Sequence, residues 1–199
     1  MAQLRQHGVV LEGQTSRGVR IRLRPMAEDD WDLLLKWNND PDVLYWAEGD
    51  DITSRTLHEV QDLYRTVSRT AFCFVIEVGD VPVGECWLQE MNVTRISERH
   101  PGLDCRRIDL MIGEKGLWGQ GIGTETIRLL TDFGFRQQSA DALFGCFVSD
   151  NNPRSYRAFQ RVGYQIIETR ECDPGGKSRF EYTLRLTREA YLRLGSETG

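Results

Sequence analysis

The feature that most constrains this chain is a glycine-rich turn between a strand pattern and a helix pattern. The strand pattern covers residues 104–113, and the helix pattern covers residues 123–137. Between them, Gly119, Gly121 and Gly123 alternate with other residues. Glycines let a backbone approach a ligand without Cβ obstruction, and the N–H groups of a helix's first turn carry partial positive charge. The segment therefore predicts a strand–turn–helix unit whose turn binds an anion.

The spacing of these glycines excludes two common phosphate-binding motifs. They do not form G-x-G-x-x-G with an acidic residue about twenty positions later, and the chain contains no G-x-x-x-x-G-K-[ST]. A dinucleotide-binding motif and a P-loop are therefore excluded. Converging N–H groups in such a turn suit a pyrophosphate.

The other hydrophobic patterns predict one mixed α/β domain. Apolar residues alternate with arginines over residues 19–24, which is the period of a half-buried strand. Gly79 and Asp80 separate two strand-like runs and predict a tight hairpin. The predicted strands are residues 19–24, 71–78, 81–91, 104–113, 142–148, 164–171 and 179–186; the predicted helices are 27–38, 53–67 (capped by Thr53 or Ser54), 123–137 and 152–162 (stopped at Gly163).

Two segments carry no such pattern. Residues 92–102 are polar and predict a loop. Residues 1–18 predict a polar N-terminal extension that frays, followed by a domain of residues 19–199.

Composition excludes several classes of protein. Of the 199 residues, 40% are apolar and 28% charged, as in soluble globular domains. The longest apolar run, Ala71–Ile76, is too short to cross a bilayer, and the N-terminus lacks a stretch of signal-peptide length. The five cysteines are an odd number, no two closer than thirteen residues, and the three histidines are isolated. We therefore expect a cytoplasmic protein with reduced thiols, no membrane partner and no metal.

The net charge of −5 is unevenly distributed. Residues 28–62 hold eleven carboxylates against two cations, a net −9, which leaves +4 on the rest of the chain. Such an acidic segment attracts polycations and disfavours nucleic acid as a partner, and the basic remainder suits an anionic cofactor. The alternative is that these acids are solvated helix faces and first turns.

Two segments resemble the GCN5-related N-acetyltransferase (GNAT) superfamily. The turn Leu117–Glu125 resembles its pyrophosphate loop, and residues 152–164 are similar to its Asn-x-x-(Ala/Ser)…Tyr-x-x-x-Gly-Phe segment. The resemblance extends over residues 19–187. It implies an α/β (α+β) fold with a single mixed, mainly antiparallel sheet flanked by helices, and with splayed strands 4 and 5. It also implies acetyl-CoA as co-substrate, its pantetheine arm lying in the gap.

The resemblance assigns cofactor-binding roles position by position. These fall on Leu110 and Ile112 through their backbone, on Gly119, Gln120, Gly121, Gly123 and Thr124 at the pyrophosphate, and on Asn152 at the pantetheine arm. Two positions depart from the family pattern. Trp118 replaces the usual Arg or Gln, which matters little if the loop works through backbone N–H groups. Phe159 replaces the usual general-acid Tyr, so that role would fall to water or Tyr156, or be dispensable; the alternative for Phe159 is core packing.

Within the superfamily, the chain most resembles the aminoglycoside 6′-N-acetyltransferases. The similar segments are residues 33–46, residues 53–60 with Tyr64, and residues 101–109. The resemblance implies acetyl transfer to an amine of a cationic aminoglycoside, at the 6′ position, and hence antibiotic resistance. An alkylammonium with a pKa of about 10 must lose a proton before it attacks a thioester. Asp109 would accept that proton or orient the ammonium.

The same resemblance implies a substrate-binding set of Trp46, Asp109, Asp150 and Asp173. Trp46 would stack under a sugar ring or fill the core. Asp150 and Asp173 also suit turns for reasons unrelated to substrate. The partner expected is a small polycationic amine.

Two other functions stay open at this point. One is a protein N-terminal or small-amine acetyltransferase, since Arg24-Pro25 and residues 118–121 also suit that branch. The other is a catalytically silent acetyl-CoA sensor, suggested by Phe159. The chain could be a monomer or a homodimer.

Overall fold

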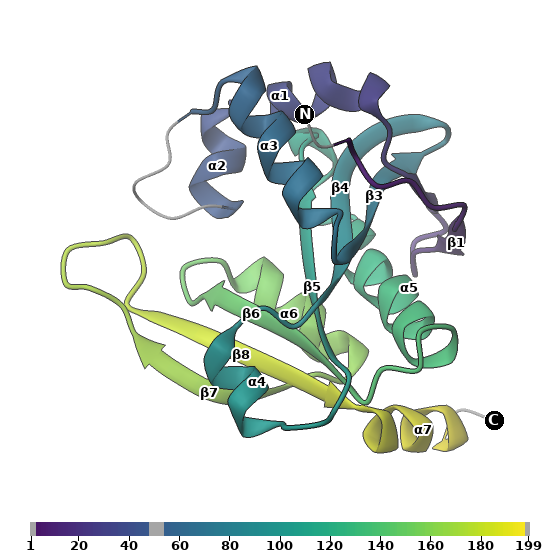
Figure 1. Ribbon diagram of the computed structural model, residues 1–199, viewed down its shortest axis with the longest axis vertical. Coiled ribbons are helices and arrows are strands. Elements are labelled where there is room, and N and C mark those ends of the chain that lie inside the picture. Colours follow the sequence, from purple (N-terminus) through teal and green to yellow (C-terminus); the bar gives the residue numbers. More distant parts are fainter. Residues whose placement is uncertain (1–2, 48–53, 198–199) are drawn as a thin grey trace. The chain divides into compact units, whose positions relative to one another are not determined.

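The chain folds as a mixed α/β protein (Figure 1), and the computed structural model describes residues 3–47 and 54–197. Within these residues, hydrogen bonds join eight strands in the order β1-β2-β3-β4-β5-β6-β8-β7. The strands are β1 (Leu11–Gln14), β2 (Arg20–Pro25), β3 (Ala71–Val78), β4 (Val81–Glu90), β5 (Cys105–Ile112), β6 (Ala142–Ser149), β7 (Gln165–Glu171) and β8 (Phe180–Thr187). The helices are α1 (Trp31–Trp37), α2 (Pro41–Ala47), α3 (Leu57–Val67), α4 (Thr94–Arg99), α5 (Ile122–Arg136), α6 (Pro153–Val162) and α7 (Arg188–Glu197), with 3₁₀ turns η1 (Glu28–Asp30) and η2 (Lys115–Leu117).

The strand pairing confirms the expected mixed, mainly antiparallel sheet. The pairs β1–β2, β2–β3, β6–β8 and β7–β8 are antiparallel, whereas β5 and β6 are parallel. The parallel ladder joins residues 105–107 to residues 142–144, although both strands continue beyond it. So short a ladder is what two splayed strands predict, and Asp109 lies two residues past its end.

Contacts between residues divide the chain into two compact units. Unit 1 comprises residues 1–87 and 110–126, and unit 2 comprises residues 88–109 and 127–199. Strands β4 and β5 and helix α5 each begin in one unit and end in the other. The expected division into an extension of residues 1–18 and a domain of residues 19–199 follows different boundaries and stays a prediction.

The core of unit 1 is built on α1, α3 and β3. Trp31, Leu34 and Trp37 recur every three residues along α1 and are buried in one apolar cluster. Tyr64 of α3 joins them with its ring, and its hydroxyl accepts a hydrogen bond of 3.0 Å from the Asn38 amide. Full burial of a large apolar side chain contributes about 1.5–3 kcal/mol to folding. The helix predicted over residues 27–38 is therefore present as η1 and α1, with its apolar side chains in the core.

The N-terminal segment is not frayed over its described residues, so that expectation is wrong. Residues 11–14 form β1, which pairs with β2. Upstream, the side chain of Leu4 is 4% exposed within the unit 1 core. The backbone N–H of Arg5 donates to the Ser68 hydroxyl (3.0 Å), and its guanidinium donates to the Arg69 carbonyl (3.0 Å). These partners lie more than sixty residues away in sequence, where local composition gives no signal of them.

Helix α3 begins later than the sequence predicted. Its N-cap is Thr56, whose hydroxyl accepts from the Glu59 N–H (3.3 Å), while the Glu59 carboxylate accepts from the Thr56 N–H (2.6 Å). This reciprocal capping box satisfies two donors that the helix leaves unpaired. Of the two caps expected, Thr53 lies outside the described residues, and Ser54 precedes the helix.

Three helices were not expected. Pro41 begins a new helix, α2, because proline suits a first helical turn and the Asp40 carboxylate accepts from the N–H groups of Asp42 (3.0 Å) and Val43 (3.3 Å). The predicted loop of residues 92–102 contains α4, which buries Ile96. After β8 the chain forms α7.

Unit 2 contains the β6-β8-β7 strands and helix α6, and Figure 1 shows β7 and β8 side by side with a long connecting loop. Helix α6 begins at the Asn152 cap and ends at Gly163, whose φ of 107° is left-handed, as predicted. The hydroxyl groups of buried Tyr164 and Thr131 lie 2.9 Å apart. Burial raises the pKa of Tyr164 despite that hydrogen bond. Across the described residues, no helix is long and apolar enough to span a membrane.

The N-terminal segment generates a pH prediction through His7. Its Nε2 lies 2.9 Å from the Cys73 carbonyl, and its Nδ1 accepts from the Val9 N–H (3.3 Å), so the fold requires the neutral ring. Burial lowers the pKa of His7 from 6.5. The unfolded state therefore binds a proton more readily, and stability is lost as the pH falls through and below 6.5. We expect the free energy of unfolding to fall between about pH 8 and about pH 5 more steeply than in His7→Gln. Parallel curves from chemical denaturation would contradict this.

Candidate functional site

The glycine-rich turn lies in unit 1, between the end of β5 and the start of α5. Gly119 and Gly121 have φ values of 76° and 87°, in the left-handed region that disfavours residues with a Cβ. Within the described chain, the N–H groups of Gly119, Gln120 and Gly121 donate to no protein acceptor. The next three N–H groups begin α5 and have no partner within a helix. The turn therefore presents a row of unpaired donors at a helix N-terminus.

The start of the turn is fixed against α1. A Cβ on Gly113 would lie 2.2 Å from the Trp37 ring, so only glycine allows this approach. The Trp37 indole N–H donates to the Glu114 carboxylate (2.9 Å), which also pairs with Lys36 (2.5 Å). Hydrogen bonds from Lys36 and then Trp37 lower the pKa of Glu114. Two successive residues of the turn are thus held by one helix.

Lys115, the next residue, pairs with the acidic segment. Its ammonium lies 2.6 Å from the Asp42 carboxylate and 3.0 Å from the Asp40 carboxylate. The hydrogen bonds that Lys115 donates to Asp42 and Asp40 raise the pKa of Lys115, and the bond from Lys115 lowers the pKa of Asp40. The beginning of α2 and the beginning of the turn are therefore joined by charge.

Other acids of residues 28–62 also have partners within the protein. Asp30 is 5% exposed and forms two hydrogen bonds of 2.7 and 2.8 Å with Arg24. Glu28 pairs with Arg65 (3.0 Å), and Glu59 belongs to the α3 capping box. These contacts give several acids a structural role. Glu59 lies in a helix first turn, as the alternative interpretation expected, whereas Asp30 is buried rather than solvated. Glu48, Asp50 and Asp51 lie outside the described residues.

The end of the turn is fixed by two further contacts that the sequence did not predict. The Trp118 indole N–H donates to the Ile112 carbonyl (2.8 Å), which folds the turn back onto β5. Buried Glu125 accepts a hydrogen bond of 3.1 Å from the Gln14 N–H. A Cβ on Gly121 would lie 3.5 Å from Thr15. The last residue of β1 and the residue after it therefore pack beside the turn, although no local pattern links them to it.

The other binding residues predicted in unit 1 lie near the glycine turn or on α2. The Leu110 side chain would lie 3.5 Å from a Cβ on Gly123, and Ile112 offers its carbonyl to Trp118. The predicted cofactor residues of unit 1 are thus brought together by one strand–turn–helix segment. Trp46 is half-buried near the end of α2 and meets the Tyr45 ring edge-on, with centroids 4.8 Å apart.

In unit 2, Asp109 forms a two-point ion pair with Arg107. The Arg107 Nη2 lies 2.5 Å from Oδ1, and its Nε lies 2.7 Å from Oδ2. The Asp109 side chain is 22% exposed and that of Arg107 is 15% exposed. Sequence reasoning found the carboxylate but missed the arginine. The signal was available, because residues i and i+2 of a strand project from the same face.

A β-bulge in β6 adds an aromatic ring to this cluster. The β6–β8 register shifts between Gly145 and Val148, and Phe147 within the bulge has a φ of 55°. The Phe147 ring is met by the guanidinium carbons of Arg95 at 5.1 Å and Arg107 at 5.6 Å. A left-handed, exposed phenylalanine is costly, and such strain tends to accompany function.

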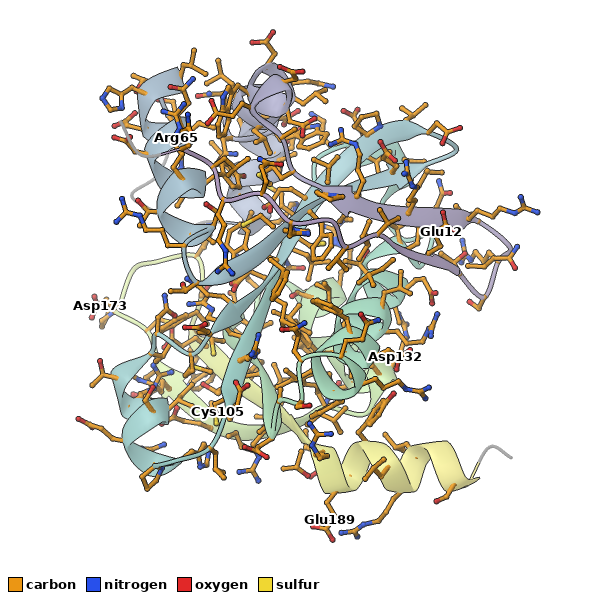
Figure 2. The ribbon with its side chains drawn as sticks, turned by 45° about the vertical axis from the view of Figure 1, so that its right-hand side comes forward. Glu12, Arg65, Cys105, Asp132, Asp173 and Glu189 are labelled. Atoms are coloured by element: carbon orange, nitrogen blue, oxygen red, sulfur yellow. The ribbon has the colours of Figure 1, made fainter. Side chains whose placement is uncertain are left out.

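Asp150, Asn152 and Asp173 lie in unit 2. Asp150 accepts a hydrogen bond from the Arg179 N–H (3.1 Å). Asn152 caps α6 by accepting from the Ser155 N–H (3.3 Å). Figure 2 shows Asp173 on the loop between β7 and β8, pointing outward. Asp150 and Asn152 therefore stabilise the local backbone, in addition to any binding role.

Phe159 belongs to the core of unit 2. Its side chain is 2% exposed, and its ring meets Tyr164 edge-on with centroids 5.1 Å apart. A Cβ on Gly145 of β6 would lie 2.8 Å from the Phe159 ring, so a side chain at that position would clash with it. Tyr156, one turn earlier on α6, is half-buried against Tyr182. The packing interpretation therefore accounts for Phe159.

The cysteines are free and spread over both units. Cys73, Cys86, Cys105 and Cys146 are buried, and Cys172 is partly exposed. Burial raises the pKa of Cys146 to about 12, which keeps its thiol protonated at neutral pH. Among the described residues, no three His, Cys, Asp or Glu side chains gather as a metal site.

Comparisons with known proteins agree on a family. A family model described as "Acetyltransferase (GNAT) domain" matches residues 20–165. Aminoglycoside N(6')-acetyltransferase type 1 of Klebsiella pneumoniae is 24% identical over 196 residues, covering 92% of this chain and 90% of that protein. The structure of AAC(6')-Ib with ribostamycin and coenzyme A is similar at a TM-score of 0.73 and 22% identity, covering 87% of this chain and 96% of that one. Spermidine N-acetyltransferase from Vibrio cholerae, in complex with CoA and spermine, is similar at a TM-score of 0.69 and 17% identity, covering 86% and 98%.

The capping contact of Asn152 separates a structural role from a binding role. Asn152→Ala should lower the free energy of unfolding by about 1 kcal/mol, because a helix donor loses its acceptor. Asn152→Ser keeps an N-cap oxygen and should preserve stability within a few tenths of a kcal/mol. Urea denaturation of both variants checks this. Equal destabilisation by serine and alanine would contradict the capping role.

Proposed function

The chain belongs to the acetyltransferase (GNAT) domain family, and we propose that it transfers acetyl from acetyl-CoA to an amine of a cationic aminoglycoside, at the 6′ position. One observation carries the proposal: a glycine turn at the start of α5 leaves its N–H groups unpaired within the described chain. Such donors suit the diphosphate of coenzyme A. The acceptor is inferred from the relative in Klebsiella pneumoniae and from the acidic segment. Antibiotic resistance and a cytoplasmic location follow from this proposal.

The residues of the turn fit the diphosphate on their own geometry. A Cβ on Gly119 would meet nothing within 4 Å, so this part of the backbone is open to a ligand. We assign the diphosphate to Gly119, Gln120, Gly121, Gly123 and Thr124, and the pantetheine arm to Leu110, Ile112 and Asn152. Bound there, acetyl-CoA supplies a thioester whose carbonyl carbon an amine can attack.

The transfer needs a deprotonated acceptor amine. Its nitrogen lone pair forms the new C–N bond, the nitrogen loses a proton as the amide forms, the C–S bond breaks, and the thiolate leaves and takes up a proton. Asp109 accepts the ammonium proton or orients the ammonium, a contribution of about 10²- to 10⁴-fold for proton transfer. Phe159 has no hydroxyl, so the proton for the thiolate comes from water or from Tyr156.

The proposed acceptor is polycationic because of the field of residues 28–62. Ion pairs such as Lys115 with Asp42 satisfy individual acids but leave the net charge of that segment negative. Trp46 would offer its indole to a sugar ring, and Asp150 and Asp173 would bind further ammonium groups. The chain acts either as a monomer or as a homodimer.

A small linear amine is the second candidate acceptor. The spermidine N-acetyltransferase has a similar fold, and several acids of residues 28–62 are already paired within the protein. A linear amine needs fewer carboxylates than a polycationic sugar. An N-terminal peptide amine and a silent acetyl-CoA sensor are the remaining alternatives.

An acceptor screen tests the proposal. Thiol release from acetyl-CoA is followed with kanamycin, tobramycin, gentamicin, spermidine and a peptide with a free N-terminus, and products are located by mass spectrometry and NMR. The proposal requires turnover of an aminoglycoside with acetyl on the 6′-nitrogen. Turnover of spermidine or the peptide alone would transfer the assignment to that acceptor. Tight CoA binding without any turnover would favour the sensor.

The glycine turn predicts a matched pair of variants. Gly121→Ala places a Cβ at a φ of 87°, which costs an L-residue roughly 1–2 kcal/mol. We expect the dissociation constant of CoA to rise about fivefold to thirtyfold as the turn relaxes. Gly116→Ala, in the same segment, meets nothing within 4 Å and should leave it unchanged. Calorimetry measures both, and equal affinities would contradict binding through this turn.

A further inference from the structure

We propose that Arg107 is a positioning residue that fixes the Asp109 carboxylate for acetyl transfer. This inference rests on the proposed function, since it assigns how the carboxylate of that reaction is held. All the residues concerned lie in unit 2 and surround the guanidinium group of Arg107.

The ion pair between Arg107 and Asp109 has two-point geometry. Arg107 reaches Oδ1 of Asp109 through Nη2 (2.5 Å) and Oδ2 through Nε (2.7 Å). Two parallel charge-assisted hydrogen bonds fix the plane of a carboxylate, which a single contact from a lysine cannot do. A carboxylate oxygen carries two lone pairs, and a bidentate arginine occupies one on each oxygen. Arg107 therefore fixes the plane of the carboxylate without occupying every acceptor position of the group.

The Arg107 guanidinium is itself held by contacts with Asn92 and Phe147. Its remaining nitrogen, Nη1, donates to the side-chain amide oxygen Oδ1 of Asn92 (3.2 Å). Its carbon lies 5.6 Å from the centre of the Phe147 ring, and the side chain is 15% exposed. All three nitrogens and one face are thus engaged. A group fixed on so many sides can orient its partner with little loss of entropy on binding.

The Phe147 ring comes from the β-bulge in β6, where the backbone is strained. Phe147 is 47% exposed and left-handed, which costs roughly 1–2 kcal/mol for an L-residue. The same ring meets Arg95, which is fixed in turn by Glu168 (3.1 Å) and the Thr183 hydroxyl (3.2 Å). The bulge thereby places one ring against two guanidinium groups. Retained strain of this kind is expected where it maintains a functional arrangement.

The chain provides a matched control on the same strand. Arg106 is one residue away, and its side chain is 13% exposed. It pairs with Asp104 through Nε (3.0 Å) and Nη2 (2.9 Å), also at a spacing of two residues. Successive residues of a strand project to opposite faces. Arg106→Lys therefore breaks a similar ion pair without touching Asp109.

The experiment measures kcat and KM for the amine acceptor identified by the screen. Arg107→Lys keeps the positive charge but loses the two-point hydrogen bonding to Asp109. It should lower kcat/KM about tenfold to a hundredfold, because the carboxylate is then misplaced. The dissociation constant of CoA should change less than about twofold, which also shows that the variant is folded. Arg106→Lys should change kcat/KM by less than about twofold.

A double-mutant cycle separates positioning from general damage. If Arg107 acts through Asp109, Arg107→Lys has no further effect on kcat/KM in an Asp109→Asn background. Phe147→Leu, which removes the ring face, should lower kcat/KM several-fold in the parent and not in that background.

Two outcomes would overturn the inference while leaving the proposed function intact. One is an equal loss from Arg107→Lys in both backgrounds, and the other is a loss no greater than that from Arg106→Lys. Absence of turnover by the unchanged chain with every amine would instead contradict the proposed function, and the inference with it.

Discussion

The approach of Gly113 to the Trp37 ring is the constraint on which the turn before α5 depends. No side chain fits there, so the end of β5 lies directly on α1. Glu114 and Lys115 then extend the attachment to the first two helices through Trp37, Lys36 and the acids that begin α2. With its start fixed in this way, and with Trp118 folded onto β5, the turn can hold Gly119 and Gly121 in left-handed conformations. The result is a row of unpaired N–H donors whose backbone conformation is fixed by the protein itself.

The structure shows which carboxylates of the acidic segment, residues 28–62, are paired within the protein. The sequence shows only an excess of carboxylates in residues 28–62. In the structure, Asp30 is locked to Arg24, and hydrogen bonds to Asp30 and Glu77 raise the pKa of Arg24 even though burial opposes this. Asp40 and Asp42 hold the turn through Lys115. The acids therefore have two separable effects: local pairs that build unit 1, and a net negative field that attracts cations from a distance.

The sequence predicted those features whose cause is local. The Gly79-Asp80 hairpin forms with φ values of 56° and 63°, the conformations that such a pair favours in a two-residue turn. The ends of α6 follow from Asn152 and Gly163, and the strand–turn–helix around the glycines follows from their spacing.

The features that the sequence did not predict depend on distant partners. Strand β1 and buried Leu4 are ordered by residues of β2, α3 and β3. Helices α2 and α4 are too short for their periodicity to stand out, at seven and six residues. Arg107, which holds Asp109, is itself held by Asn92 and Phe147, and these two residues lie on other segments of the chain. Single-sequence patterns carry no information on such encounters.

The most direct test of the account is to observe the backbone N–H groups of residues 119–124 during ligand binding. Amide NMR of labelled protein would be recorded with CoA and with pantetheine, which lacks the diphosphate. We expect CoA to shift these amide resonances and to slow their hydrogen exchange, whereas pantetheine leaves them near their free positions. Saturating, calorimetrically verified CoA binding with unchanged amides at residues 119–124 would contradict it.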